Sequence, residues 1–245
     1  MKNSLVIIPT FNEKENIALI LDAAMAVNTE LHVLVVEDNS PDGTAEIVKQ
    51  KIIQYPERIQ ILERKGELGL GTAYIAGFKY AIEKGYDIVI EMDADFSHNP
   101  NDLPKLYKSC TEGGNHLAIG SRYKNGVNVV NWPMNRVLMS YFASKYVKFI
   151  TGMPLNDATA GFVCYRTELL KAMDLDAIRF VGYAFQIEMK FTSWIMNAKI
   201  EEVPIVFTDR TLGESKMSPK IFKEAFFGVI SMKIKSVFDK PKFRF

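Results

Sequence analysis

Short apolar runs alternate along this chain with stretches in which apolar side chains recur at helical spacing. The apolar runs cover residues 5–8, 31–36, 59–62, 87–92 and 117–122. Between the first two runs, helical spacing is carried by Ile17, Ile20, Leu21 and Ala24. Near-continuous apolar runs are typical of strands covered on both faces, and strands that alternate with helices form βαβ units. The pattern therefore predicts an α/β fold with a mostly parallel sheet flanked by helices.

Acidic and turn-forming residues follow directly after three of the predicted strands. They are residues 9–13 (PTFNE), 37–44 (EDNSPDGT) and 93–100 (DADFSHNP). The carboxyl ends of parallel strands meet at one edge of a sheet, and open α/β sheets bind their ligands there. We therefore expect the three segments to build one common site.

Asp93 and Asp95 are the most informative of these residues, because a buried strand ends abruptly in two carboxylates one residue apart. Hard oxygen donors suit Mg²⁺ or Mn²⁺, which typically take one or two carboxylates together with substrate phosphate oxygens. The pair therefore predicts a site for a metal ion and a diphosphate. The alternative is a polar turn after a strand, because short motifs often arise by chance.

Other residues at this edge each allow two interpretations. Glu13 fits a contact with a ribose hydroxyl, or the first turn of a helix, where acidic residues are favoured. Asp38 fits a hydrogen bond from a base or ribose, or an N-terminal helix cap. Gly69 and Gly71 open a predicted helix and allow a phosphate or sugar to approach the backbone closely, or they form a tight turn.

The segments at residues 9–13, 37–44, 69–73 (GLGTA) and 93–100 together resemble the inverting glycosyltransferases of family two. Four further segments narrow the resemblance to the dolichol-phosphate (polyprenol-phosphate) mannose synthases. These are residues 120–123 (GSRY), 157–162 (DATAGF), 182–189 (GYAFQIEM) and Arg210 with 213–217 (GESKM). Two departures are visible: Glu37 precedes Asp38 where the family usually has a double aspartate, and Phe11 stands where it often has tyrosine.

The resemblance implies transfer of mannose from GDP-mannose to a polyprenyl phosphate with inversion, giving polyprenyl-phosphate mannose and GDP. It implies a single GT-A type domain over residues 1–218 and a Mg²⁺ or Mn²⁺ cofactor on Asp93 and Asp95. The implied donor-binding residues are Pro9, Phe11, Glu13, Glu37, Asp38, Asp93, Ala94, Arg210 and Lys216. The implied acceptor-phosphate residues are Arg122, Arg136 and Ser140, and the implied catalytic residues are Asp95, Arg122 and Arg136. Asp157 and Glu188 fall in acceptor-side segments, and we expect one of the two to orient the sugar or the metal region.

Residues 135–151 form a predicted helix that is apolar nearly all round. Arg136 and Ser140 lie four residues apart and therefore share one helix face. An arginine on an apolar, membrane-proximal helix is costly unless it meets an anion, and a lipid phosphate is a suitable partner. The alternative is that Arg136 extends along the apolar surface until its guanidinium reaches water.

Residues 219–238 are long enough to span a membrane, but charged residues interrupt them, whereas a spanning helix needs roughly 20 mostly apolar residues. They instead predict an amphipathic helix with Phe222, Phe226, Val229 and Ile230 near one face. A basic tail at residues 233–245 suits an anionic membrane surface. We therefore expect a peripheral protein on the cytoplasmic face of a membrane, with residues 219–245 as a membrane-proximal extension. A membrane-anchoring protein is a possible partner. The alternative is a helix packed on the domain with solvated lysines.

Composition agrees with one globular enzyme domain. The chain has 245 residues, which is enough for a full α/β core. A net charge of +1 gives no indication of nucleic-acid binding. Two cysteines, Cys110 and Cys164, do not make a disulfide framework, and we expect both to be inert core or semi-buried thiols. No signal peptide is recognisable before the first strand.

Two rival functions stay open. One is a related transferase that uses another nucleotide sugar, such as glucose or aminoarabinose, or another acceptor. The other is a non-catalytic nucleotide-sugar-binding module. The presence of the acidic pair together with Arg122, Arg136 and Arg210 argues against the second.

Overall fold

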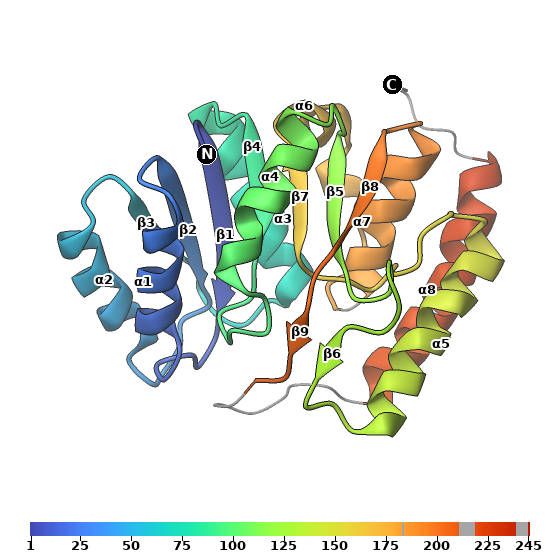
Figure 1. The fold of residues 1–245 in the computed structure, drawn as a ribbon, viewed down its shortest axis with the longest axis horizontal. Helices are drawn as coiled ribbons and strands as arrows, with labels where there is room; N and C mark the ends of the chain where they lie inside the picture. Colours follow the sequence, from blue (N-terminus) through green and yellow to red (C-terminus); the bar gives the residue numbers. More distant parts are fainter. Residues whose placement is uncertain (183, 211–218, 239–244) are drawn as a thin grey trace.

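A computed structural model describes the chain except residues 183, 211–218 and 239–244 and the side chains of residues 219–225. The described part contains a seven-stranded sheet with the order β3-β2-β1-β4-β7-β5-β8 (Figure 1). The strands are β1 Ser4–Thr10, β2 Leu31–Glu37, β3 Ile59–Glu63, β4 Ile88–Glu91, β5 Leu117–Ser121, β7 Val163–Arg166 and β8 Ile200–Pro204. All of them run parallel except β7, which is antiparallel to both β4 and β5.

Helices cover both faces of the sheet. One layer consists of α1 Ile17–Val27, α2 Thr44–Gln54 and α4 Leu103–Thr111, and the other of α3 Leu70–Lys84, α6 Thr167–Ala172 and α7 Ala184–Ile195. Successive residues of β1 point to opposite layers, so Val6 and Ile8 enter one core while Leu5 and Ile7 enter the other. Double coverage explains why the strands are continuously apolar, and it confirms the predicted α/β fold.

The five predicted strands are present as β1 to β5, and the helical spacing after the first strand corresponds to α1. The sequence did not predict β7, β8, or the short parallel pair of β6 Val129–Val130 with β9 Phe207–Thr208. β7 has four residues, and β8 (IEEVP) carries two glutamates, so neither presents a long apolar run. Cys110 and Cys164 are buried free thiols, which confirms that prediction.

The predicted apolar helix is α5 Met134–Thr151, and the predicted amphipathic helix is α8 Pro219–Phe238. The two helices run side by side (Figure 1). The ring of Tyr146 on α5 stacks on Phe226 of α8 at a centroid distance of 4.7 Å, and its hydroxyl donates to the Phe226 carbonyl at 2.9 Å. Val229 and Met232 of α8 are buried. A methyl group on Gly228 would lie 2.7 Å from the Phe180 ring, so α8 crosses that ring closely. The inner face of α8 is thus part of the domain's packing.

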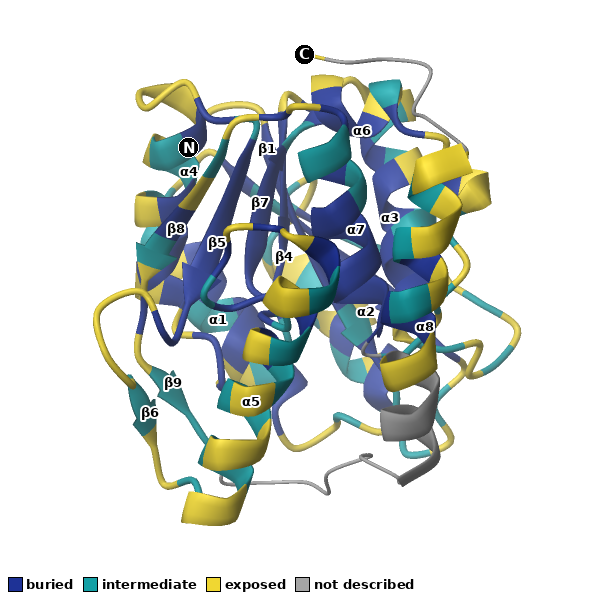
Figure 2. Cartoon of the chain, turned by 90° about the vertical axis from the view of Figure 1, so that its right-hand side faces the viewer, coloured by how far each residue is buried: buried dark blue, intermediate teal, exposed yellow. Residues whose placement is uncertain are grey.

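The outer faces of α5 and the described part of α8 are exposed (Figure 2), and they carry large apolar side chains. We call this set of residues the α5–α8 surface: Leu138, Met139, Phe142 and Phe149 on α5, with Phe227, Ile234, Val237 and Phe238 on α8. α8 therefore combines features of both sequence alternatives, because it packs on the domain and also exposes apolar side chains. Phe222 lies outside the described side chains. Among the described helices, none has the length and apolar character needed to cross a membrane.

Candidate active site

Asp93 and Asp95 lie just beyond the end of β4, at the carboxyl edge of the parallel strands. The Asp95 carboxylate is buried and forms an ion pair with Arg210 at 2.7 Å. One oxygen of Asp95 also accepts from the backbone N–H of Ser97 at 3.0 Å, and the Tyr74 hydroxyl donates to Asp93 at 3.4 Å. The structure thus brings Asp93, Asp95 and Arg210 together as predicted, and Tyr74 is an addition that the sequence did not indicate.

The two carboxyls titrate differently because their surroundings differ. Burial, together with the neighbouring charge of Asp95, raises the pKa of Asp93 to about 7. Burial by itself also raises the pKa of Asp95, but hydrogen bonding from Ser97 and the charge of Arg210 outweigh it and leave that pKa below its usual value. At neutral pH Asp95 therefore carries the negative charge, while Asp93 retains a proton in part of the molecules.

The donor-side acids at the ends of β1 and β2 are already engaged with neighbouring groups. Asp38 is bound through both oxygens by Arg64, at 2.5 and 2.6 Å, and the same guanidinium donates to Thr72 at 2.8 Å. Glu37 accepts from the backbone N–H groups of Asn39 and Ser40, each at 2.8 Å. The Glu37 carboxylate therefore stabilises the turn that directly follows β2. The sequence analysis missed Arg64, although a basic residue two positions after the third predicted strand was a usable signal.

The remaining donor-side predictions fall at the same edge. Glu13 accepts from the Asn16 amide at 3.0 Å, and its backbone N–H donates to Thr44. Phe11 directly follows β1, Pro9 lies within it, and Ala94 is buried between the two aspartates. Lys216 lies outside the described residues. Contacts of these residues with a donor stay a prediction.

Gly69 and Gly71 approach protein atoms closely. A methyl group on Gly71 would lie 2.6 Å from the Phe180 carbonyl oxygen and 2.8 Å from the Phe185 ring. The Gly71 N–H donates to the Val181 carbonyl at 2.8 Å. A methyl group on Gly69 would lie 3.2 Å from Val181. The structure explains Gly71 by its packing against the segment before α7, and Gly69 also by its φ of +93°, a conformation that favours glycine. Approach of a phosphate or sugar to these glycines stays a prediction.

Arg122 is held by the carboxylate of Asp157, one of the two acids predicted on the acceptor side. Its Nε and Nη2 atoms donate to Asp157 at 2.8 and 2.6 Å, and its backbone N–H donates to the same carboxylate at 2.9 Å. Burial alone raises the pKa of Asp157, but the Arg122 charge outweighs it and leaves that pKa lowered. Glu202 in turn holds the Asp157 N–H at 2.9 Å. Asp157 therefore orients Arg122, whereas Glu188 holds the backbone of residues 179 and 180.

Arg136 and Arg122 converge on Trp132. Their guanidinium carbons lie 4.2 and 5.4 Å from the Trp132 ring centroid. Arg136 also forms an ion pair at 2.7 Å with Asp209, the residue before Arg210. Ser140, one turn along α5, lies beside the buried Tyr123 ring. The predicted acceptor residues are thus gathered at one place next to the acidic pair, and their contact with an acceptor phosphate stays a prediction.

A buried polar network lies beneath the acidic pair, and the sequence did not indicate it. Glu91, the last residue of β4, accepts from Gln186 at 2.6 Å and from the Tyr165 hydroxyl at 3.2 Å. Lys190 donates to Gln186 and, at 2.7 Å, to the Ala160 carbonyl. Burial raises the pKa of Glu91 to about 8 and lowers the pKa of Lys190 to about 8. The network ties β4 to the segment that precedes β7.

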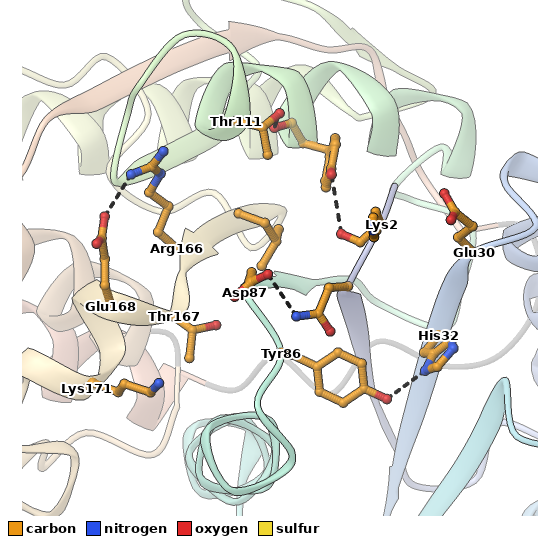
Figure 3. Close-up of a pocket in the computed structure, with 13 residues that line it drawn as sticks. Lys2, Glu30, His32, Tyr86, Asp87, Thr111, Arg166, Thr167, Glu168 and Lys171 are labelled. Atoms are coloured by element: carbon orange, nitrogen blue, oxygen red, sulfur yellow. Dashed lines mark hydrogen bonds and ion pairs between the residues drawn. The ribbon is translucent and has the colours of Figure 1, made fainter.

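A hollow of about 920 Å³ lies at the opposite edge of the sheet (Figure 3). Many of its polar side chains form hydrogen bonds with one another. Asp87 accepts from Asn3 at 2.8 Å, and Nδ1 of His32 lies 2.7 Å from the Tyr86 hydroxyl oxygen. None of the predicted site residues lines it. This hollow is therefore separate from the carboxyl-edge site.

The acidic pair supplies two of the several oxygen ligands that a divalent ion takes. Within the described residues, no set of three or more His, Cys, Asp and Glu side chains is grouped to hold an ion. Asp93 and Asp95 supply two hard oxygen ligands, and a cation would oppose both the burial and the repulsion by Asp95 that raise the pKa of Asp93. The residues present therefore fit Mg²⁺ or Mn²⁺ held jointly with a diphosphate.

Two known proteins share much of this chain's sequence. The chain is 41% identical over 241 residues to polyprenol monophosphomannose synthase of Mycolicibacterium smegmatis, covering 98% of this chain and 91% of that protein. It is 45% identical over 221 residues to undecaprenyl-phosphate mannosyltransferase of Micrococcus luteus, covering 90% of each.

Solved structures agree in fold. Glucosyl-3-phosphoglycerate synthase of Mycobacterium tuberculosis, in complex with Mg²⁺ and uridine diphosphate, matches with a TM-score of 0.69 and 17% identity, covering 100% of this chain and 81% of that one. The same synthase with Mn²⁺, uridine diphosphate and phosphoglyceric acid gives a TM-score of 0.67, covering 98% and 80%. These likenesses show the fold alone, and they confirm the GT-A type. The family model described as "Glycosyl transferase family 2" matches residues 5–173. The chain therefore belongs to glycosyltransferase family 2, as its strand-end motifs predicted.

Proposed function

We propose that this protein transfers mannose from GDP-mannose to a polyprenyl phosphate, with inversion at the sugar's anomeric carbon. The observation that carries the proposal is the juxtaposition, at one sheet edge, of the acidic pair with two arginines that converge on Trp132. The acidic pair suits a nucleotide diphosphate, and the arginines suit a second phosphate. Both named relatives act on lipid-linked phosphates according to their names.

The acceptor supplies its own nucleophile. A phosphate monoester has a second pKa of about 6 and is largely dianionic at neutral pH, so it can attack the sugar without a strong general base. The protein then has to position the acceptor and donor and to stabilise the charge that develops in the transition state. Arg136, steadied by Asp209 and Trp132, would orient the acceptor phosphate, and Arg122, held by Asp157, would add positive charge nearby. A single in-line displacement gives the inverted product and releases GDP.

The negative charge of the leaving diphosphate would be stabilised at the donor side of the site. Asp93 and Asp95 would hold Mg²⁺ or Mn²⁺, which when bound supplies positive charge to the diphosphate. Arg210 is paired with Asp95 in this structure, and a diphosphate beside Asp95 would lie within its reach. Asp38, fixed by Arg64, presents a carboxylate at the end of β2 for the nucleoside.

A donor comparison tests the sugar and nucleotide. We expect GDP-mannose to be used at least about tenfold more efficiently than GDP-glucose, UDP-glucose or a UDP-linked aminoarabinose, because Glu37 and Asp38 occupy the positions of the family's nucleoside contact. The measurement is the kcat/KM of each donor with a short polyprenyl phosphate, read by mass spectrometry of the lipid product. A clear preference for a uridine-linked sugar would reject the mannose assignment and favour the rival transferase. Binding of every donor without any product would favour the non-catalytic module.

The α5–α8 surface supports peripheral attachment to the membrane that holds the lipid acceptor. Phe149 and Phe238 are each 85% exposed. Burying one such ring in the interface is worth about 1.5–3 kcal/mol. We therefore expect Phe149→Glu/Phe238→Glu to weaken binding to phosphatidylglycerol vesicles at least tenfold in a sedimentation assay. Transfer to a short, soluble acceptor should be retained.

The matched control is Ile53→Glu, which places the same charge at a residue 82% exposed on α2, distant from this surface. Its vesicle binding should equal that of the unaltered protein. Binding of the unaltered protein should also weaken as salt rises, because lysines of the C-terminal region contribute. Failure of the unaltered protein to bind at low salt would contradict attachment through this surface.

A further inference from the structure

His98 belongs to the turn that begins with Asp93, yet the sequence-based prediction gave it no role. The residue is 2% exposed. Its ring stacks on Phe162 at a centroid distance of 4.9 Å, and Phe207 meets it edge-on at 5.6 Å. These two aromatic contacts fix the plane of the imidazole at the sheet edge that carries the acidic pair.

The hydrogen bonding of the ring determines which nitrogen carries the proton. The backbone N–H of Asp93 points at Nδ1 of His98 across 3.1 Å. A backbone N–H can only donate, so Nδ1 must accept, and the neutral ring must carry its hydrogen on Nε2. Within the described part of the chain, the ring has no other hydrogen bond. Nε2–H is therefore a fixed donor that remains available to a ligand.

Gly161 leaves room beside this donor. A methyl group on Gly161 would lie 3.4 Å from Cε1 and 3.8 Å from Nε2 of His98, and 3.9 Å from an Asp93 carboxylate oxygen. These are its nearest neighbours, all at ordinary contact distances, and Gly161 is partly exposed. Lys190 anchors the preceding residue through the Ala160 carbonyl at 2.7 Å. An imidazole N–H and an oxygen of the acidic pair thus both border the partly exposed space at Gly161, where a methyl group would fit, and Lys190 holds the neighbouring backbone in place.

We propose that this space receives the sugar ring of the donor, and that His98 Nε2–H donates to a sugar hydroxyl. The inference rests on the proposed function, because it requires the donor diphosphate to lie at Asp93 and Asp95. The sugar is bonded directly to that diphosphate, so it must lie within a few ångströms of the pair. A buried N–H left without its acceptor is costly, so His98 would select sugars that place a hydroxyl correctly. His98 is then a specificity-determining residue.

Gly161→Ala tests the space. The added methyl makes only ordinary contacts with protein atoms, so the fold should tolerate it. We expect GDP affinity, measured by titration calorimetry with Mn²⁺, to stay within about twofold, and GDP-mannose affinity and kcat/KM to fall about tenfold or more. Gly66→Ala is the control, because a methyl there has no neighbour within 4 Å. Unchanged GDP-mannose binding in Gly161→Ala overturns the proposal, as does an equal loss for GDP and GDP-mannose.

Two substitutions at His98 separate its two nitrogens. Asparagine places an oxygen near the position of Nδ1 and keeps an acceptor for Asp93, whereas glutamine places an N–H near the position of Nε2. We expect His98→Asn to retain GDP binding with Mn²⁺ while its preference for GDP-mannose over GDP-glucose falls about tenfold. His98→Gln should retain more of that preference and lose GDP affinity. The opposite pattern, or equal preference in both variants, overturns the assignment of Nε2.

The result of these tests is independent of the donor comparison described above. If the unaltered protein does not use GDP-mannose, the proposed function fails, whatever His98 and Gly161 do. The same variants are then compared on the nucleotide sugar that the protein does bind and on its free nucleotide. A selective loss of the sugar's contribution in Gly161→Ala would still place the sugar beside His98, and no selective loss would reject it.

Discussion

Asp95→Asn should reduce transfer by at least about a thousandfold, equivalent to roughly 4 kcal/mol of transition-state stabilisation. The substitution preserves shape and an acceptor for Ser97 N–H, but it removes the negative charge that meets Arg210 at 2.7 Å. It also removes one of the two carboxylates available to a divalent ion. Calorimetric titration with GDP and Mn²⁺ should show weakened binding in parallel with the lost turnover.

Asp93→Asn should be severe but milder at neutral pH, because the Asp93 pKa of about 7 means that its charge is only partly present before a cation binds. Metal binding needs the deprotonated carboxylate. Affinity for GDP with Mn²⁺ should therefore rise between pH 6 and pH 8 in the unaltered protein, and this rise should be lost in Asp93→Asn.

Asp87→Asn is the matched control for both aspartate substitutions, because Asp87 precedes the other end of β4 and accepts from Asn3. It should leave transfer unchanged. If Asp95→Asn bound GDP with Mn²⁺ and turned over normally, the acidic pair would be only a polar turn that ends a strand.

Arg136→Ala should lower transfer to polyprenyl phosphate by roughly 30- to 1000-fold, the equivalent of about 2–4 kcal/mol for a lost charge-assisted contact. Donor affinity should be nearly unchanged, because the acidic pair, Asp38 and Arg210 lie on the donor side. The measurement is the dissociation constant for GDP-mannose and the turnover on a soluble acceptor, both on the same variant. An arginine that only reaches water would change membrane affinity and leave this turnover intact.

Arg136→Ala could also lower transfer indirectly. Arg136 forms an ion pair with Asp209, which directly precedes Arg210, so its loss could displace Arg210. Asp209→Asn separates the two routes. It removes the ion pair but keeps the Arg136 charge and its contact with Trp132, so transfer should fall far less than in Arg136→Ala if Arg136 acts on the acceptor. If Asp209→Asn reproduced the loss and weakened donor binding, Arg136 would act by positioning the Arg210 segment, and its assignment to the acceptor side would be wrong.

Much of the fold was predictable because its signals are local. β1 to β4 are apolar runs that end in polar turns, and the spacing of Ile17, Ile20, Leu21 and Ala24 identifies α1, in which all four are buried. The position of the acidic pair beyond β4 follows from the same pattern. The antiparallel insertion of β7 between β4 and β5 was not predictable, because strand order depends on pairings between distant segments.

The charge partners in the site were the least predictable feature. Asp38 and Asp157 were each recognised as candidates, but their arginine partners lie 26 and 35 residues away along the chain. His98 was quoted within a motif, and only the three-dimensional turn shows that its Nδ1 accepts from Asp93. Sequence spacing gives no distance between such groups, so it could not show which candidates face the ligand space and which are held by neighbours.

The sequence by itself determined the family, the double-sided sheet and the edge at which the chemistry lies, because apolar periodicity and strand-end motifs are encoded in neighbouring residues. Only the tertiary structure decided the use of each side chain. It directed Gly71 to protein packing, left space beside Gly161, and placed Arg122 against Asp157. It also decided which apolar face of α8 is buried. Both faces carry apolar residues, so the choice depends on the surfaces of α5 and α7, which belong to other parts of the chain.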